Sequence, residues 1–90
     1  MDILRLPIIR SMTLLSTSSQ ISVAIIARRR ILGLSQSDVA KKVGLSQPRY
    51  SQLESDPARL TLARFLSLLG VLGLEITLQE KPASTTTTEW

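Results

Sequence analysis

The residues best suited to chemistry in this chain are polar side chains grouped between positions 46 and 51. Gln47 can bond adenine at N6 and N7 together, and Arg49 can do the same at guanine O6 and N7. Ser46 and Ser51 add hydroxyl groups that can donate to a base or a phosphate. Because these side chains belong to the start of a predicted helix, they predict contacts with DNA bases in the major groove.

A second group of residues is expected to contact the DNA backbone. Gln36 opens the preceding predicted helix, whose N-terminal dipole attracts phosphate, and Ser35 lies beside it. Lys42 would add a phosphate contact, with a solvated surface charge as the alternative. Tyr50 has two interpretations: its hydroxyl contacts a phosphate, or its ring packs in the core.

Two short helices joined by a turn must position these residues, and the pattern over residues 34–55 predicts them. Ser35 is a suitable N-cap for the first helix, and Ser46 is one for the second. Gly44 ends the first helix, since glycine adopts the left-handed conformation without a Cβ clash. A helix, a glycine-containing turn and a second helix form a helix-turn-helix unit.

Further helices flank this unit. A capped helix is expected from Ser18 or Ser19 to about Leu32, followed by Gly33. After a loop over residues 56–60, Thr61 is a plausible N-cap for a last helix that Gly73 stops. The predicted fold class is therefore mainly α, with a four- to five-helix DNA-binding domain over residues 18–73.

The hydrophobic period changes after Gly73. Leu74, Ile76 and Leu78 alternate with polar residues, which predicts a β-strand over residues 74–80. A single strand leaves its backbone groups unpaired, and no second strand is evident in the helical chain before it. We therefore expect this strand to pair with its copy in a homodimer. The alternative is an extended segment packed on its own domain.

The two ends of the chain differ from the middle. Residues 1–17 are an apolar N-terminal extension of uncertain order, interrupted by charge and proline, and the start of translation is either Met1 or Met12. Residues 81–90 lack apolar periodicity, which predicts a flexible tail. This tail ends in Trp90, which is expected to enter a pocket of a partner protein; the alternative is that it folds back.

Composition excludes several classes of function. The chain has no cysteine and no histidine, which removes disulfides, imidazole catalysis and the usual zinc sites. Its carboxylates show no paired arrangement, so we expect no catalytic residue, metal or cofactor and no enzyme. No apolar stretch approaches the roughly 18 residues of a membrane span. A net charge of +4, concentrated between residues 28 and 64, favours an anionic partner. Without cysteine, residence in the cytoplasm is the default, at the nucleoid when the chain binds DNA.

Residues 19–73 resemble the phage-repressor-like helix-turn-helix family of the Cro and Xre type. The signature positions of that family are occupied by Gln36, Ala40, Gly44, Ser51 and Glu54. The resemblance implies that an arginine late in the first helix pairs with the glutamate that closes the recognition helix. These residues are Arg29 and Glu54 in this chain, and the resemblance gives them a structural role.

A narrower resemblance is to the HipB-type antitoxins, partners of HipA kinase toxins. It is carried by AKKVGLSQ, SQLESDP, TLARFLSLL and LEITL, and by the closing Glu-Trp pair. It implies a dimer that binds palindromic operator DNA, represses its own operon and binds a HipA-like kinase toxin, with Trp90 in a toxin pocket. Ser46, Pro48 and Arg49 depart from the family, so its operator sequence does not carry over. The alternative is a stand-alone dimeric repressor without a toxin.

Overall fold

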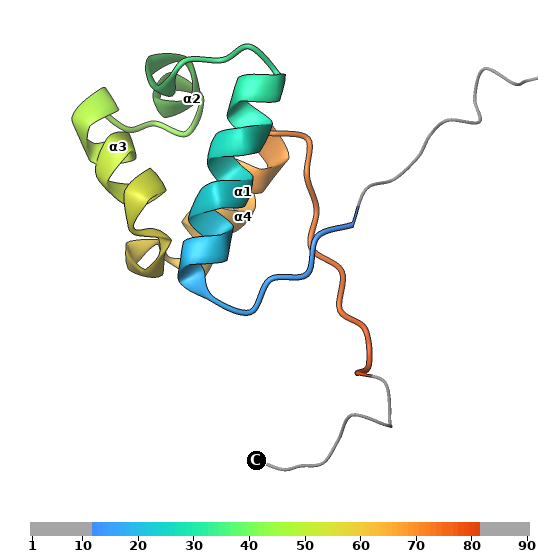
Figure 1. Cartoon of the computed structure of the whole chain (residues 1–90). Coiled ribbons are helices and arrows are strands. Elements are labelled where there is room, and N and C mark those ends of the chain that lie inside the picture. The colour runs from blue at the N-terminus through green and yellow to red at the C-terminus, as the bar shows by residue number, and fades with distance from the viewer. Residues whose placement is uncertain (1–11, 82–90) are drawn as a thin grey trace, which may run out of the picture.

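The structure, a computed structural model, describes residues 12–81 and is built from helices in that part of the chain (Figure 1). Its elements are α1 (Ser18–Ile31), α2 (Gln36–Lys42), α3 (Gln47–Ser55), the 3-10 helix η2 (Pro57–Arg59) and α4 (Leu62–Val71). The prediction of a mainly helical domain is confirmed. Most of the N-terminal extension, and the tail with Trp90, lie outside the described residues.

Local side-chain bonds set where the helices begin. The hydroxyl of Ser35 accepts from the backbone N–H of Asp38 at 3.0 Å, and a carboxylate oxygen of Asp38 accepts from the N–H of Ser35 at 2.8 Å. Ser46 and Thr61 cap α3 and α4, as predicted. Helix α1 begins at Ser18, one of its two predicted starts, and its cap is Thr17. The side chain three positions later is a glutamine that bonds back to the N–H of Thr17, so the pair forms a capping box.

The turn between α2 and α3 depends on Gly44, whose φ of 75° lies in the left-handed region. Leu45 follows, and its N–H bonds the carbonyl of Ala40 at 2.9 Å, which satisfies one of the last carbonyls of α2. The chain can therefore start α3 after a short connection. This is the helix-turn-helix that the sequence predicted.

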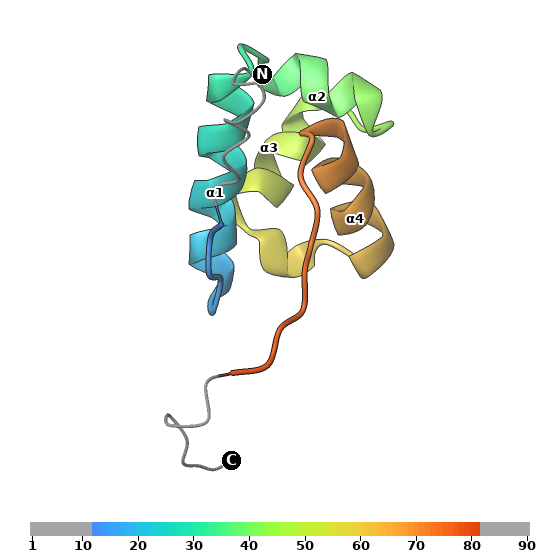
Figure 2. The ribbon, with the colours of Figure 1, turned by 90° about the vertical axis from the view of Figure 1, so that its right-hand side faces the viewer.

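The four helices enclose one small core. In the view of Figure 2, α1 and α4 stand on opposite sides, with α2 across the top and α3 behind. The largest fully buried side chains come from α1, α2, α3 and the C-cap of α4: Ile25, Val39, Tyr50 and Leu72. Because the core closes around α3 and leaves its first turn at the surface, the domain holds that turn on a rigid support.

Residues 74–80 leave α4, reverse direction and run back past the α1 and α4 side of the domain (Figure 2). They form no strand within residues 12–81, where no second extended segment pairs with them. Leu74 packs against the core, whereas Ile76 is 47% exposed and Leu78 is 92% exposed. The strand and its pairing across a dimer therefore stay predictions. Within the same range, no helix has the length and apolar character to cross a membrane.

Candidate nucleic-acid interface

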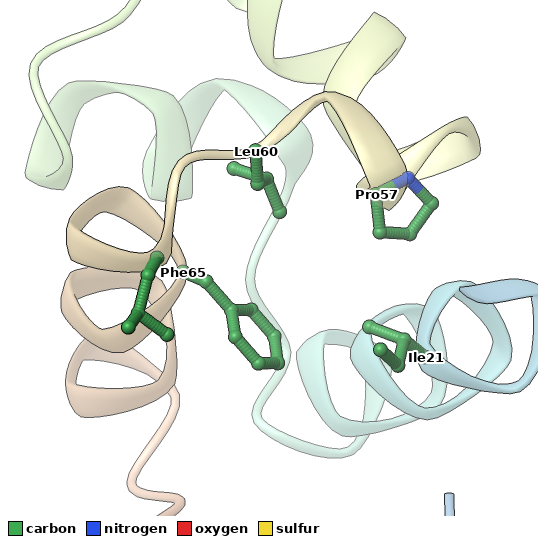
Figure 3. Close-up of a pocket in the computed structure, with 5 residues that line it drawn as sticks. Ile21, Pro57, Leu60 and Phe65 are labelled. Carbon is green, nitrogen blue, oxygen red and sulfur yellow. The ribbon is translucent and has the colours of Figure 1, made fainter. Parts of the chain in front are cut away.

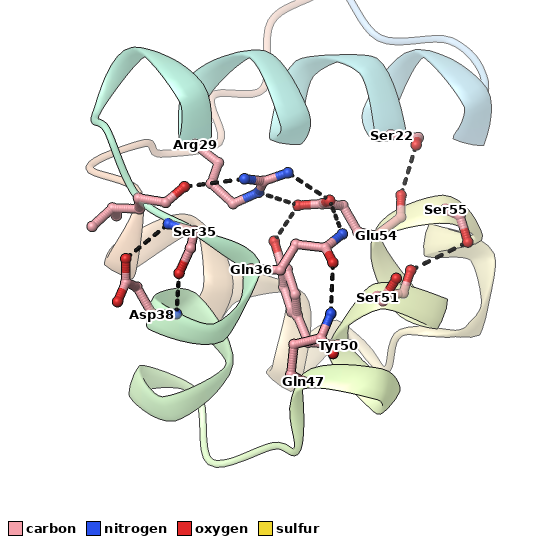
Figure 4. A network of polar contacts seen from close by, with 11 residues as sticks. Ser22, Arg29, Ser35, Gln36, Asp38, Gln47, Tyr50, Ser51, Glu54 and Ser55 are labelled. Atoms are coloured by element: carbon pink, nitrogen blue, oxygen red, sulfur yellow. Dashed lines mark hydrogen bonds and ion pairs between the residues drawn. The ribbon is translucent and has the colours of Figure 1, made fainter.

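A polar network centred on Glu54 joins the three N-terminal helices (Figure 4). One carboxylate oxygen accepts from Nε of Arg29 at 2.8 Å and from the hydroxyl of Tyr50 at 2.7 Å. The other accepts from Nη2 of Arg29 at 3.1 Å and from Nε2 of Gln36 at 2.8 Å. The ion pair expected between Arg29 and Glu54 is thus present, and both oxygens of a nearly inaccessible carboxylate are satisfied.

Burial and hydrogen bonding oppose each other at Glu54. Burial alone would raise the pKa of its carboxyl, but the bonds from Arg29, Gln36 and Tyr50 stabilise the charged form and leave the pKa below its ordinary value. The hydrogen bond to Glu54 raises the pKa of Arg29. Burial, reinforced by the bond to Glu54, raises the pKa of Tyr50. At neutral pH the network therefore holds one carboxylate, one guanidinium and one neutral phenol.

Arg29 also ties α1 to the rest of the helix-turn-helix. Its Nη1 atom donates to the carbonyl of Leu34 at 3.0 Å, just before α2 begins. On the same helix, the hydroxyl of Ser22 donates to the backbone carbonyl of Glu54 at 2.6 Å, which is at the end of α3. Together these bonds fix the orientation of α3 relative to α1.

Gln36 extends the network from the core to the surface. Its Nε2 donates to Glu54, and its Oε1 accepts from Nε2 of Gln47 at 2.8 Å (Figure 4). The residue expected to bind phosphate therefore also holds the residue expected to contact a base. The second N–H of its amide is not needed for either bond. The phosphate contact of Gln36 stays a prediction, and this second N–H is the donor available for it.

The residues expected to contact bases gather at the first turn of α3. Ser46, Gln47 and Arg49 are exposed there, and Ser51 is half-buried one turn further along the helix. The oxygen of Ser46 accepts from the N–H of Arg49 at 3.3 Å, which leaves its hydroxyl proton as a donor. The fold thus brings the residues predicted to contact bases together in the first two turns of α3. Their contact with DNA stays a prediction.

The residues expected to contact the DNA backbone differ in their exposure. Lys42 is exposed at the end of α2, and Ser35 is exposed at its start. Tyr50 is 1% exposed and its hydroxyl donates to Glu54, so the structure does not support the phosphate contact expected of it. The core interpretation of Tyr50 is the one that the structure bears out, because the ring fills the space between the helices.

Two arginines counted in the basic middle of the chain have internal roles that the sequence did not indicate. Nε of Arg28 donates to the carbonyl of Leu72 at 2.8 Å, and Nη1 of Arg64 donates to the carbonyl of Val43 at 2.8 Å. Each carbonyl ends a helix, where backbone acceptors lack partners. No local pattern distinguishes such an arginine from a solvated one, because its acceptor lies far away in the sequence.

An apolar pocket of about 240 Å³ lies between α1, η2 and α4 (Figure 3). The side chains that line it are Ile21, Pro57, Leu60, Leu62 and Phe65. None of these can transfer a proton or act as a nucleophile, so the pocket offers no catalytic group. The exposed side chains that can form hydrogen bonds with a ligand lie elsewhere, at the first turn of α3.

Comparison with known proteins agrees with this geometry. Residues 25–79 match the family described as Helix-turn-helix. The antitoxin HipB of Escherichia coli (strain K12) is 41% identical over 58 residues, which are 63% of this chain and 66% of HipB. The matched stretch thus spans just under two thirds of that relative. Neither the family nor this relative is described as an enzyme.

Solved structures give the same result over the whole length of the matched chains. HipB in a HipB-O1-O2 complex has a TM-score of 0.69 and 32% identity, covering 77% of this chain and 100% of that one. A chain of a HipA-HipB-O2-O3 complex has a TM-score of 0.71 and 31% identity, covering 79% and 100%. The chain therefore belongs to the helix-turn-helix family and, within it, is similar to the HipB antitoxins.

Proposed function

We propose that this chain is a HipB-like antitoxin that binds palindromic operator DNA as a homodimer, represses its own operon and binds a HipA-like kinase toxin. The observation that carries the proposal is the exposed first turn of α3, with Gln47 held by Gln36 on a domain similar to HipB over the full length of solved HipB chains. The proposed role is binding alone, without a chemical step.

In the proposed complex, α3 enters the major groove with its first turn against the base edges. Gln47 and Arg49 make the base contacts, and Ser46 and Ser51 add hydroxyl donors. Ser35, Gln36 and Lys42 lie at the two ends of α2 and contact the phosphates that flank the groove. The bond between Gln36 and Gln47 supports this assignment, because it orders a glutamine side chain before DNA binds.

The proposed dimer forms through residues 74–80. Ile76 and Leu78 point apolar side chains into solvent on a segment with no backbone partner in the described part of the chain. Pairing with a second copy would satisfy both the backbone groups and the apolar side chains. A two-fold dimer then places two copies of α3 on half-sites about 34–36 Å apart, or a multiple of that spacing.

DNA binding is tested by fluorescence anisotropy with the DNA upstream of the chain's own gene and a scrambled duplex of equal length. The expected result is tighter binding to the upstream DNA, with affinity that falls steeply as salt rises, because phosphate contacts release counterions. Equal, salt-insensitive binding to both duplexes would contradict the proposal. It would favour a domain of this fold used for protein contacts.

Toxin binding needs a separate test, because a stand-alone repressor would also bind DNA. A kinase-like reading frame beside the gene supplies the candidate toxin, and pull-down with the full chain is the expected positive result. The chain shortened after Glu80 tests the tail, whose Trp90 is proposed to enter a toxin pocket. Unchanged binding by the shortened chain would remove that role from Trp90, and no binding by the full chain would favour the stand-alone repressor.

A further inference from the structure

The chain reverses direction sharply between α4 and residues 74–80, and the reversal is held by several bonds. Gly73 has a φ of 70°, in the left-handed region. The N–H of Leu74 bonds the carbonyl of Leu69 at 2.8 Å, and the N–H of Gly73 bonds the carbonyl of Gly70 at 3.1 Å. These are the bonds of a helix end closed by glycine. They use the carbonyls of Leu69 and Gly70 and leave the carbonyl of Leu72 for another donor.

That donor comes from a different helix. Nε of Arg28, in the last turn of α1, donates to the carbonyl of Leu72 at 2.8 Å. Nη2 of the same guanidinium lies 3.1 Å from the position that a Cβ at Gly73 would occupy. Arg28 therefore bonds Leu72 and lies beside Gly73, the two residues at which the chain turns, and it couples α1 to the direction in which residues 74–80 leave the domain.

We propose that Arg28 is a positioning residue for dimerisation, which orients residues 74–80 for pairing with a second copy. This inference rests on the dimer in the proposed function. A segment that already points in the pairing direction loses less conformational freedom when it pairs, so the dimer is tighter. Its neighbour Arg30 is exposed and makes no comparable bond within residues 12–81, which provides a control on the same turn of α1.

The size of the effect follows from population arithmetic. Loss of the bond lets residues 74–80 sample other directions, so the fraction of protomers ready to pair falls. A fall of about threefold in each protomer multiplies to about tenfold in the dissociation constant, because both copies carry the change.

Two substitutions of equal length separate the hydrogen bond from the bulk and charge of the side chain. In Arg28→Gln the amide nitrogen stands the same number of bonds from Cα as Nε, and it can donate to the carbonyl of Leu72. In Arg28→Met a methyl group takes that place and cannot donate. Both variants lose the positive charge. Arg30→Met loses a charge on the same helix without touching Leu72.

The experiment measures the dimer dissociation constant of the full chain by sedimentation, at a temperature where circular dichroism shows each variant folded. Arg28→Met should weaken the dimer by about tenfold, whereas Arg28→Gln and Arg30→Met should remain within about twofold of the unchanged chain. A purely structural role would lower the melting temperature of Arg28→Met and leave its dissociation constant unchanged. That result, or equal weakening by Gln and Met, would overturn the role of the bond.

Gly73→Ala serves as a second variant if Arg28→Met does not fold. Its Cβ would meet Nη2 of Arg28 at 3.1 Å in a left-handed conformation, so it should also weaken the dimer. An unchanged dissociation constant for Gly73→Ala would then overturn the proposal. If the unchanged chain stays monomeric, the proposed dimer itself is wrong, and the role of Arg28 is rejected with it. If the unchanged chain is dimeric and all variants have similar dissociation constants, only the role of Arg28 is rejected.

Discussion

Nε2 of Gln47 donates a hydrogen bond of 2.8 Å to Oε1 of Gln36, and this bond links the exposed turn of α3 to the buried carboxylate of Glu54. A glutamine side chain alone in water samples many rotamers, and ordering it on binding costs free energy. The bond to Gln36 orders it in the free chain. In the proposed complex, Gln36 therefore has two roles: it orders Gln47 for its base contact, and it contacts a phosphate.

Gln36→Ala is expected to lower affinity for the operator by about 1 kcal/mol or more, because Gln47 loses its support. If orientation of Gln47 is the main effect, affinity for scrambled DNA should change less than affinity for the operator. Anisotropy titrations with both duplexes measure the two effects. Gln52→Ala, an exposed glutamine on α3 outside the network, is the control. An equal loss on both duplexes would assign Gln36 to phosphate contact alone.

Gln47→Ala should cost about 1–3 kcal/mol on the operator and relax preference at one base position. The reason is that an amide pairs with adenine through two bonds that other bases cannot reproduce. Binding to a panel of operators with single base changes measures this. A variant that loses affinity equally for every duplex in the panel would contradict a base contact.

Lys42→Ala should weaken binding to all duplexes alike and reduce the slope of affinity against salt by about one, because a phosphate contact carries no sequence information. Salt titrations of the variant and the unchanged chain give the slope directly. Arg30→Ala, on the exposed surface of α1, is the matched control for a charge outside the interface. Equal slopes for the Lys42 variant and the unchanged chain would leave Lys42 as a solvated surface charge.

Glu54→Ala should destabilise the domain by about 3–5 kcal/mol, because it leaves the buried guanidinium of Arg29 without its partner. Tyr50→Phe keeps the ring in the core and removes one donor to the carboxylate, at a cost of about 1.5–3 kcal/mol. Urea denaturation measures both. Asp56→Ala, an exposed carboxylate 4.0 Å from Arg59, should stay within about 0.5 kcal/mol. Similar losses for Glu54 and Asp56 would contradict the role of the network.

The stability of the domain should depend on pH at both ends of the range. The pKa of Glu54 is lower in the folded chain than its ordinary value of 4.5, so its contribution is complete above that pH and is lost as the pH falls further. The pKa of Tyr50 is raised above its ordinary value of 10.0, so stability falls as the pH rises beyond 10.

Variants separate these two effects. Glu54→Gln should flatten the acid side of a plot of urea midpoint against pH, and Tyr50→Phe should flatten the alkaline side. Some acid dependence remains in the first variant, because the backbone and hydroxyl bonds from Ser35 also lower the pKa of Asp38. A plot for Glu54→Gln that is parallel to that of the unchanged chain would contradict the assignment.

Local features of the fold could be predicted from the sequence, because their causes lie within a few residues. Ser35, Ser46 and Thr61 each cap a helix by accepting from an N–H three positions later. Gly44 ends α2 because its own backbone needs a positive φ. At the start of α1 the sequence predicted the first helical residue without naming its cap, because several neighbouring residues could cap; the structure has Thr17, with the glutamine that completes the box.

Contacts between distant residues could not be predicted in the same way. The pair Arg29 and Glu54 was expected only because the chain resembles a family that has it. The bond from Gln47 to Gln36 and the bonds of the arginines to helix-end carbonyls depend on how the helices pack. Hydrophobic periodicity gives the buried face of each helix, but not which polar side chains of two helices come within 3 Å of each other.

The carboxylate of Glu54 also determines how the domain opens. Its partners come from α1, α2 and α3, so none of these helices can detach without leaving a charge or a donor unsatisfied. Their amide protons should exchange with solvent through a shared opening event, slower than that of residues 74–80. A protease that needs an unfolded segment would gain access to all three helices at once, and the proposed DNA-binding surface would persist as long as the domain stays folded.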